Sequence, residues 1–146
     1  MLTPVTPMKI TLVLTVLAGV VVVLTRVRLT RDGGEAAGRL SIPAQILNMH
    51  TASGLLALLT WGGFLYTCYA GNGLTILGYV GVLFWWSTTV AGLLILARWL
   101  PARGRHSSGP AADTWGEGPG LSALAHLGML VGSIIWTAFL VLGKLN

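Results

Sequence analysis

The chain has 146 residues, of which 54% are hydrophobic and only 9% are charged. Its mean hydropathy of +0.79 excludes a water-soluble domain, because soluble domains of this size do not expose so much apolar surface. A formal net charge of +5 would suggest nucleic acid as a partner of a soluble protein. Here the basic residues adjoin apolar segments, so we predict an integral membrane protein with lipid as a partner and no nucleic acid.

Four segments of the chain approach or exceed the roughly 20 residues that a membrane-spanning helix needs. The remaining chain is too short for a second domain, so residues 1–146 form a single membrane domain. The predicted fold class is all-α, an antiparallel four-helix membrane bundle. Its spans are predicted at residues 8–25, 46–69, 74–100 and 121–145.

The arginines gather around two of the connections between spans, at residues 26–45 and 101–120. The positive-inside rule makes both connections cytoplasmic, so both chain ends face outward. We expect the inner (plasma) membrane of a bacterium. No small-residue cleavage pattern follows the first span, which we expect to remain as an anchor. The arginines concerned are Arg26, Arg28, Arg31, Arg39, Arg98, Arg103 and Arg105.

Several chemistries are excluded or disfavoured by residue content. Cys68 is the only cysteine, which excludes an internal disulfide and the C-x-x-C-H attachment site of a covalent haem. A transporter is disfavoured because every carboxylate lies in a predicted loop. These carboxylates are Asp32, Glu35, Asp113 and Glu117.

Two tryptophans, Trp85 and Trp86, fall near the middle of the third predicted span. Interfacial anchoring, the usual role of tryptophan in membrane proteins, does not apply at that depth. We therefore expect at least one of them to face protein, a cofactor or a partner subunit.

The strongest indication of chemistry is a pair of histidines, His50 and His126, each near the start of a predicted span. The second and fourth spans run the same way in the predicted bundle, so the two histidines should lie at matching depths. Each is followed by a tryptophan about three turns later, Trp61 and Trp136, which suggests a parallel duplication of a two-helix unit.

The helical faces that carry these histidines predict a pocket. At 100° per residue, small residues lie directly below His50 and leave room for a flat ligand. On the fourth span, Gly128 and Gly132 form a G-x-x-x-G motif away from the His126 face, which suits close helix approach. The predicted cofactor-binding residues are His50, Gly54, Ala57, His126, Met129 and Ser133.

Two inward histidines on diagonal helices can hold a haem iron, since neighbouring axes ~8–10 Å apart give a diagonal of about 12–14 Å. We therefore expect haem b as the cofactor, with His50 and His126 as its metal ligands and loop arginines as partners of the propionates. Two alternatives remain. Each histidine bonds a neighbouring helix or a lipid headgroup, or the pair belongs to a metal or quinone site.

The residues around His50 also resemble a known family. The stretch from Pro43 to Gly54 contains His50-Thr-Ala-Ser-Gly, which resembles the H-x-x-[ST]-G segment opening the first helix of the cytochrome b anchor subunit of succinate dehydrogenases. The Trp61-Gly-Gly-Phe segment is similar to one in copper-resistance and b561-like membrane proteins. The anchor family usually has an arginine after this histidine, where this chain has Thr51. The resemblance therefore implies a small membrane b-type cytochrome or anchor, without that arginine's contact to quinone.

These observations predict a haem b-binding membrane subunit of a respiratory or photosynthetic electron-transfer complex. The alternative is a non-catalytic accessory subunit that stabilises a larger membrane complex. One haem near the cytoplasmic face cannot carry electrons across a ~30 Å hydrocarbon core alone. We therefore expect a subunit of an oxidoreductase complex rather than an enzyme by itself, with other membrane subunits or quinone as electron partners. Trp85, Trp86 and the first span are expected to form its contact surface.

Overall fold

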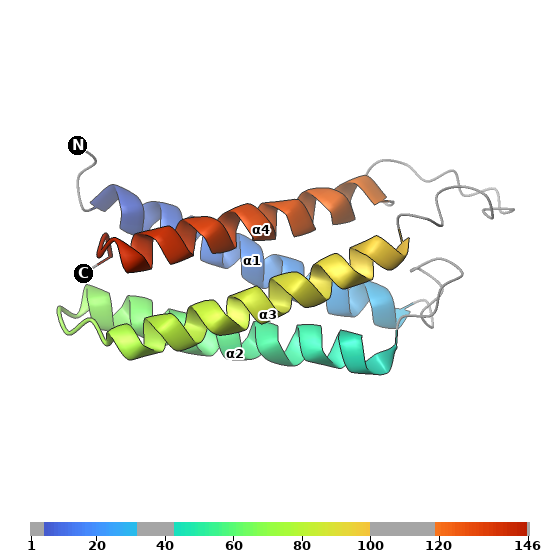
Figure 1. Ribbon diagram of the computed structural model, residues 1–146, viewed down its shortest axis with the longest axis horizontal. Coiled ribbons are helices and arrows are strands. Elements are labelled where there is room, and N and C mark those ends of the chain that lie inside the picture. The colour runs from blue at the N-terminus through green and yellow to red at the C-terminus, as the bar shows by residue number, and fades with distance from the viewer. Residues whose placement is uncertain (1–4, 32–42, 100–118, 146) are drawn as a thin grey trace, which may run out of the picture.

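The computed structural model describes residues 5–31, 43–99 and 119–145. In these residues the chain forms four helices and no strand, which confirms the all-α prediction for this part of the protein. Each helix is long and apolar enough to cross a membrane, and all four lie along the long axis of the molecule (Figure 1). They are α1 (Val5–Arg31), α2 (Ala44–Tyr69), α3 (Thr75–Trp99) and α4 (Pro119–Val141).

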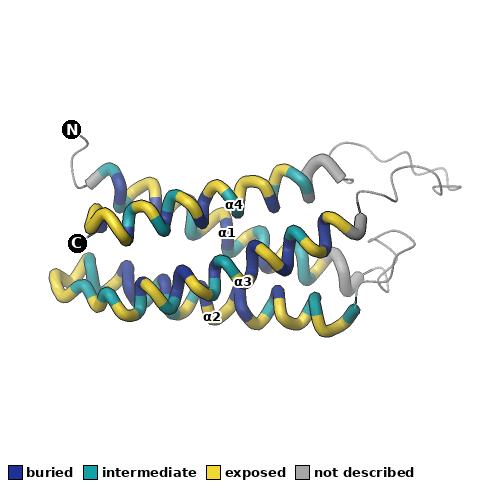
Figure 2. The backbone as a smooth tube through the Cα atoms, in the orientation of Figure 1, coloured by how far each residue is buried: buried dark blue, intermediate teal, exposed yellow. Residues whose placement is uncertain are grey.

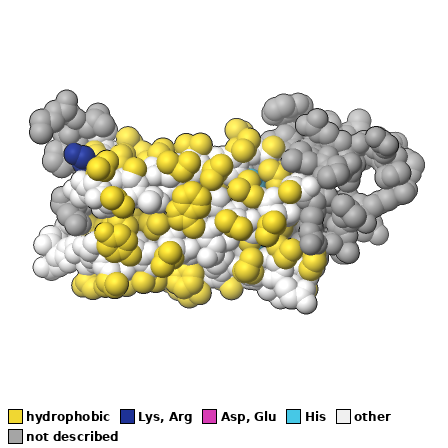
Figure 3. Space-filling model, in the orientation of Figure 1, with side chains coloured by type: hydrophobic (Ala, Val, Ile, Leu, Met, Phe, Trp, Pro, Cys, Tyr) yellow, Lys and Arg dark blue, Asp and Glu magenta, His cyan; other side chains and the backbone are white. Residues whose placement is uncertain are grey.

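The outer surface of the helices is apolar. On α1, Val13 and Val16 are 60% and 67% exposed, whereas Thr11, Ala18 and Val22 are buried at helical spacing. Figure 2 shows buried and exposed residues alternating along every helix, and Figure 3 shows hydrophobic side chains covering the described part of the visible face. So much exposed aliphatic surface on four long helices suggests a membrane protein.

The most extensive packing is between α2 and α3, which form a helical hairpin. In their short connection, Gly71 has the left-handed conformation, at φ 77°. The Gly71 N–H donates to the Cys68 carbonyl (3.1 Å) and the Asn72 N–H donates to the Thr67 carbonyl (2.9 Å). This is a Schellman motif, which satisfies the last carbonyls of α2 and reverses the chain.

The same motif ends α4 earlier than predicted. The fourth span was expected to reach Leu145, whereas α4 ends at Val141. Gly143 has φ 59° and its N–H donates to the Leu140 carbonyl, while the Lys144 N–H donates to the Phe139 carbonyl (2.8 Å). The chain then turns back so that the side chain of Leu145 is buried. A glycine just beyond the helix is the physical reason for the shorter span.

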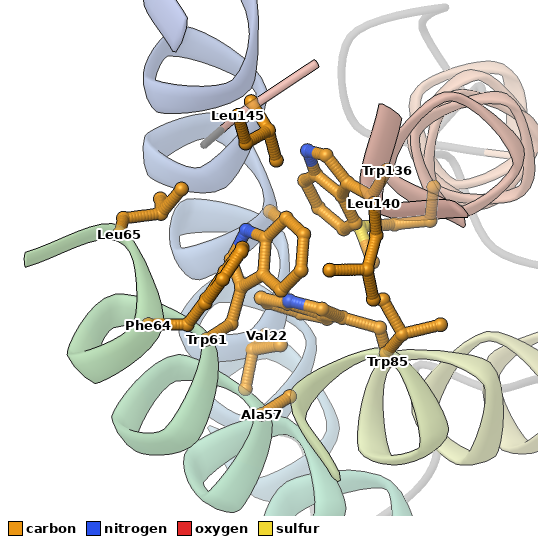
Figure 4. Close-up of a cluster of buried hydrophobic side chains, with 12 residues drawn as sticks. Val22, Ala57, Trp61, Phe64, Leu65, Trp85, Trp136, Leu140 and Leu145 are labelled. Atoms are coloured by element: carbon orange, nitrogen blue, oxygen red, sulfur yellow. The ribbon is translucent and has the colours of Figure 1, made fainter. Parts of the chain in front are cut away.

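Three tryptophans from three helices fill the middle of the interior: Trp61, Trp85 and Trp136 (Figure 4). The ring centroids are 4.9 Å apart for Trp85 and Trp136, and 5.8 Å apart for Trp61 and Trp136. Trp85 is fully buried, so the expectation that at least one mid-span tryptophan faces protein is confirmed. Trp85 was also expected to form contact surface for a partner subunit. That expectation is wrong, because Trp85 is buried inside the chain and packs against Trp136.

The α2–α3 contact depends on glycine. A Cβ atom at Gly81 would lie 2.9 Å from the backbone nitrogen and Cα of Trp61, a distance at which backbone must shift. A Cβ atom at Gly62 would meet no atom within 4 Å. Substituting Gly81 tests the close approach of the two helices, whereas substituting Gly62 tests only the effect of glycine on helix propensity.

We predict that Gly81→Ala destabilises the protein and that Gly62→Ala does not. Both changes gain about 1 kcal/mol of helix propensity, but only the first forces α2 and α3 apart, at a cost of about 1–3 kcal/mol. The free energy of unfolding in detergent, measured by denaturant titration, checks this. Equal stability of the two variants would contradict the packing described.

Candidate functional site: a buried histidine pair

The structure brings the two predicted histidines together in its interior. His50 lies near the start of α2 and His126 near the start of α4, and their side chains are 2% and 4% exposed. Their ring centroids are 6.3 Å apart, with 46° between the ring planes. The two imidazoles thus approach each other from separate helices, in the half of the molecule away from the α2–α3 turn.

Both imidazoles face one residue of α3, Gly92. A Cβ atom built there would lie 3.0 Å from Nε2 of His126 and 3.4 Å from Nε2 of His50, and only 2.5 Å from Cδ2 of His126. The two Nε2 atoms therefore converge on one point beside the α3 backbone. Gly92 was not predicted as a site residue. Its signal is a glycine inside a span of bulky apolar residues, which costs about 1 kcal/mol against alanine and needs a packing reason.

The imidazole of His50 has an unsatisfied nitrogen. Nδ1 is buried and makes no hydrogen bond to any residue in the described part of the chain. Leaving a polar group buried and unbonded costs about 1–3 kcal/mol. The simple alternative, a histidine hydrogen-bonded through this nitrogen to a neighbouring helix, is therefore not what the described residues show.

A layer of buried hydroxyls lies one to two helical turns further into the molecule than the histidines. Thr88 Oγ1 donates to Ser53 Oγ at 3.0 Å, and Thr89 Oγ1 lies 2.9 Å from Ser133 Oγ, either atom being able to donate. Adjacent threonines on α3 therefore bind the two helices that carry the histidines. Ser133, predicted to contact a cofactor, is used here in helix packing.

The other predicted pocket residues also contact protein. A Cβ atom at Gly54 would lie 2.8 Å from a methyl carbon of Val22, so α1 fills the space expected below His50. Ala57 and Met129 are buried in the core cluster that contains the three tryptophans. Of the predicted set, only His50 and His126 converge on a common point.

Two further predictions concern residues around the pair. The Arg26 guanidinium donates from Nη1 to Asn48 Oδ1 at 3.0 Å, which places one arginine beside the start of α2. The side chains of the other loop arginines lie outside the described residues. A Cβ atom at Gly128 would meet no atom within 4 Å, so no described helix packs on that end of the G-x-x-x-G motif.

The ligands available at the site limit what it can bind. The described residues contain no cluster of three or more His, Cys, Asp or Glu side chains. Structural zinc sites use four protein ligands and catalytic zinc sites use three, so two histidines do not match either. Two imidazoles do match the number of protein ligands that a b-type haem can take.

Comparisons of the chain with protein-family models, with curated proteins and with solved structures gave no match. The resemblance to the cytochrome b anchor subunit therefore stays a prediction.

We predict that Thr89→Val weakens helix association, because it removes the bond to Ser133 while nearly preserving side-chain shape. Interhelical hydrogen bonds in membrane proteins contribute about 0.6 kcal/mol on average and up to about 1.7, so the unfolding free energy in bicelles should fall by that amount. Thr60→Val is the matched control, since Thr60 Oγ1 bonds the carbonyl of Leu56 within its own helix. A loss as large in the control would contradict the assignment.

Proposed function

We propose that the chain is a haem b-binding subunit of a membrane electron-transfer complex, in which His50 and His126 would hold the iron. The chain is folded across the bilayer as an antiparallel four-helix bundle. The observation that carries this proposal is the convergence of both Nε2 atoms on Gly92, within 3.0 and 3.4 Å of one point.

Charge favours haem over a bare metal ion at this site. Moving an uncompensated charge into a low-dielectric interior costs several kcal/mol or more. Two neutral imidazoles cannot offset a divalent ion, and the described residues offer no group of acidic ligands around them. Iron in a porphyrin arrives with the two negative charges of the macrocycle, so the ferrous centre is neutral overall. An apolar interior accepts such a centre.

The spacing of the rings fits shared ligation. The ring centroids are 6.3 Å apart, and imidazole–metal bonds are about 2 Å long, so both rings would be within reach of one iron. Gly92 keeps a side chain out of the space beside the two Nε2 atoms. Nδ1 of His50, the ring nitrogen away from this point, has no hydrogen-bond partner among the described residues, so with iron at Nε2 it would need an acceptor outside them.

Haem b bound here would supply reversible one-electron chemistry. The chain's own residues hold and shield it. His50 and His126 ligate, the tryptophan layer keeps water from the far side, and Arg26, near the start of α2, supplies a positive charge at the end of the bundle that holds the histidines. A guanidinium there is suited to bind a carboxylate.

A single site at one end of the bundle favours exchange of electrons with a partner. The chain has three histidines, and none lies in the half of the helices that contains the α2–α3 turn. Lipid covers part of the apolar exterior, and other membrane subunits cover the rest. We assign this exchange to a neighbouring subunit or a quinone at the arginine-rich side. The side is cytoplasmic, in the inner membrane of a bacterium, and both chain ends lie outside.

We predict that the purified, reduced protein shows the sharp α band of low-spin b-type haem. His50→Ala and His126→Ala should each replace this band by the spectrum of high-spin haem held by the remaining histidine, and should weaken haem affinity by roughly tenfold or more, since even residues outside the ligand shell change metal affinity by about 10–100-fold. Visible absorption spectra and pyridine haemochrome assays measure both effects.

The matched control is His106→Ala, which removes the third histidine and should leave the spectrum unchanged. Intact wild-type protein that is haem-free after purification from haem-replete cells would sink the proposal. The accessory-subunit function would then stand instead.

We also predict the orientation of the chain from the positions of its arginines. In a Cys68→Ser background, a cysteine at Asn72 should react with a membrane-impermeant maleimide in intact cells, because this residue lies exposed in the α2–α3 turn. A cysteine at Ser107 should react only after permeabilisation. The reverse pattern would place the histidine pair at the outer side.

A further inference from the structure

We infer that Gly92 is the positioning residue for one of the two ligands, His126, and that it acts on this histidine rather than on His50. The spectroscopic test of this inference rests on the proposed function, because it needs bound haem. The assignment to His126 itself uses only the positions of the side chains. It assigns to α3, a helix that carries no ligand, control over whether the second ligand reaches the iron.

The distances around Gly92 are unequal for the two imidazoles. A Cβ atom there would lie 2.5 Å from Cδ2 and 3.0 Å from Nε2 of His126, but 3.4 Å from Nε2 of His50. The last value is an ordinary van der Waals contact, whereas carbon atoms 2.5 Å apart overlap strongly. A methyl group at this position therefore displaces the His126 ring and leaves the His50 ring where it is.

The His126 ring could stay in place only if α3 moved away from α4, and the contacts around Gly92 oppose that movement. One turn earlier on α3, Thr88 binds Ser53 of α2 and Thr89 binds Ser133 of α4. α2 and α4 are in far less contact with each other than either is with α3. The distance between the two ligand-bearing helices therefore depends mainly on α3, which packs on both more extensively than α1 does and cannot move away from α4 without breaking the Thr89–Ser133 bond.

The experiment compares Gly92→Ala with Gly128→Ala in the haem-loaded protein. Gly128 lies on the same helix as His126, and a methyl group there meets no atom within 4 Å. Gly92→Ala should convert six-coordinate low-spin haem into a five-coordinate form that binds carbon monoxide, as His126→Ala does. Gly128→Ala should leave the low-spin spectrum unchanged.

Combining the variants separates positioning from general damage. If Gly92 acts through His126, then adding His126→Ala to Gly92→Ala changes the spectrum no further, whereas adding His50→Ala removes the remaining ligand and the haem. Equal further losses in both combinations would overturn the inference, and so would a wild-type spectrum in Gly92→Ala.

A stability measurement covers the case in which Gly92→Ala folds poorly. Removing the displaced ring should relieve the overlap, so Gly92→Ala with His126→Ala should melt at a higher temperature than Gly92→Ala alone. Addition of His50→Ala should give no such recovery, and a recovery with His50→Ala only would overturn the assignment to His126. Wild-type protein without haem would refute the proposed function, while the melting comparison would still decide the role of Gly92.

Discussion

Hydrogen bonds between helices hold this structure together in the region of its histidines. In an apolar environment a buried hydroxyl has no water to bond, so it bonds its own helix or a neighbouring one. Thr88 and Thr89 are adjacent on α3 and therefore point to different neighbours, Ser53 on α2 and Ser133 on α4. Two short side chains thereby fix both histidine-bearing helices against a third. These bonds lie next to the two imidazoles, whose ring centroids are 6.3 Å apart.

The sizes of the residues on α3 also determine how closely the helices pack. Lipid is as apolar as the helices, so burial alone does not drive helices together in a membrane, and close packing has to contribute. On α3, Gly81 meets the backbone of Trp61, and Gly92 meets the two imidazoles. Between these glycines stands Trp85, whose ring packs against Trp136. Small and large residues thus follow one another along α3. At Gly81 the backbones of α3 and α2 lie close together, whereas at Trp85 the rings of Trp85 and Trp136 separate α3 from α4.

The sequence predicted what depends on a single helix and missed what depends on its neighbours. Span length and hydropathy were enough for four helices, and the similar positions of His50 and His126 within their spans were enough to expect them together. The room expected below His50 was a property of α2 alone, and Val22 of α1 fills it. The role of Gly92 could not be predicted for the same reason, because helical periodicity says which residues share a face but not which helix packs on that face.

The division of the interior into layers connects the packing to the proposed chemistry. The buried histidines come first, the buried hydroxyls one to two turns further along the helices, and the buried tryptophans after them. The fully buried rings of Trp61 and Trp85 separate the histidine layer from the α2–α3 end of the molecule and keep water from reaching it from that side. Haem held as proposed would therefore lie near one end of the bundle, and a partner at that end would be the nearest group with which to exchange electrons.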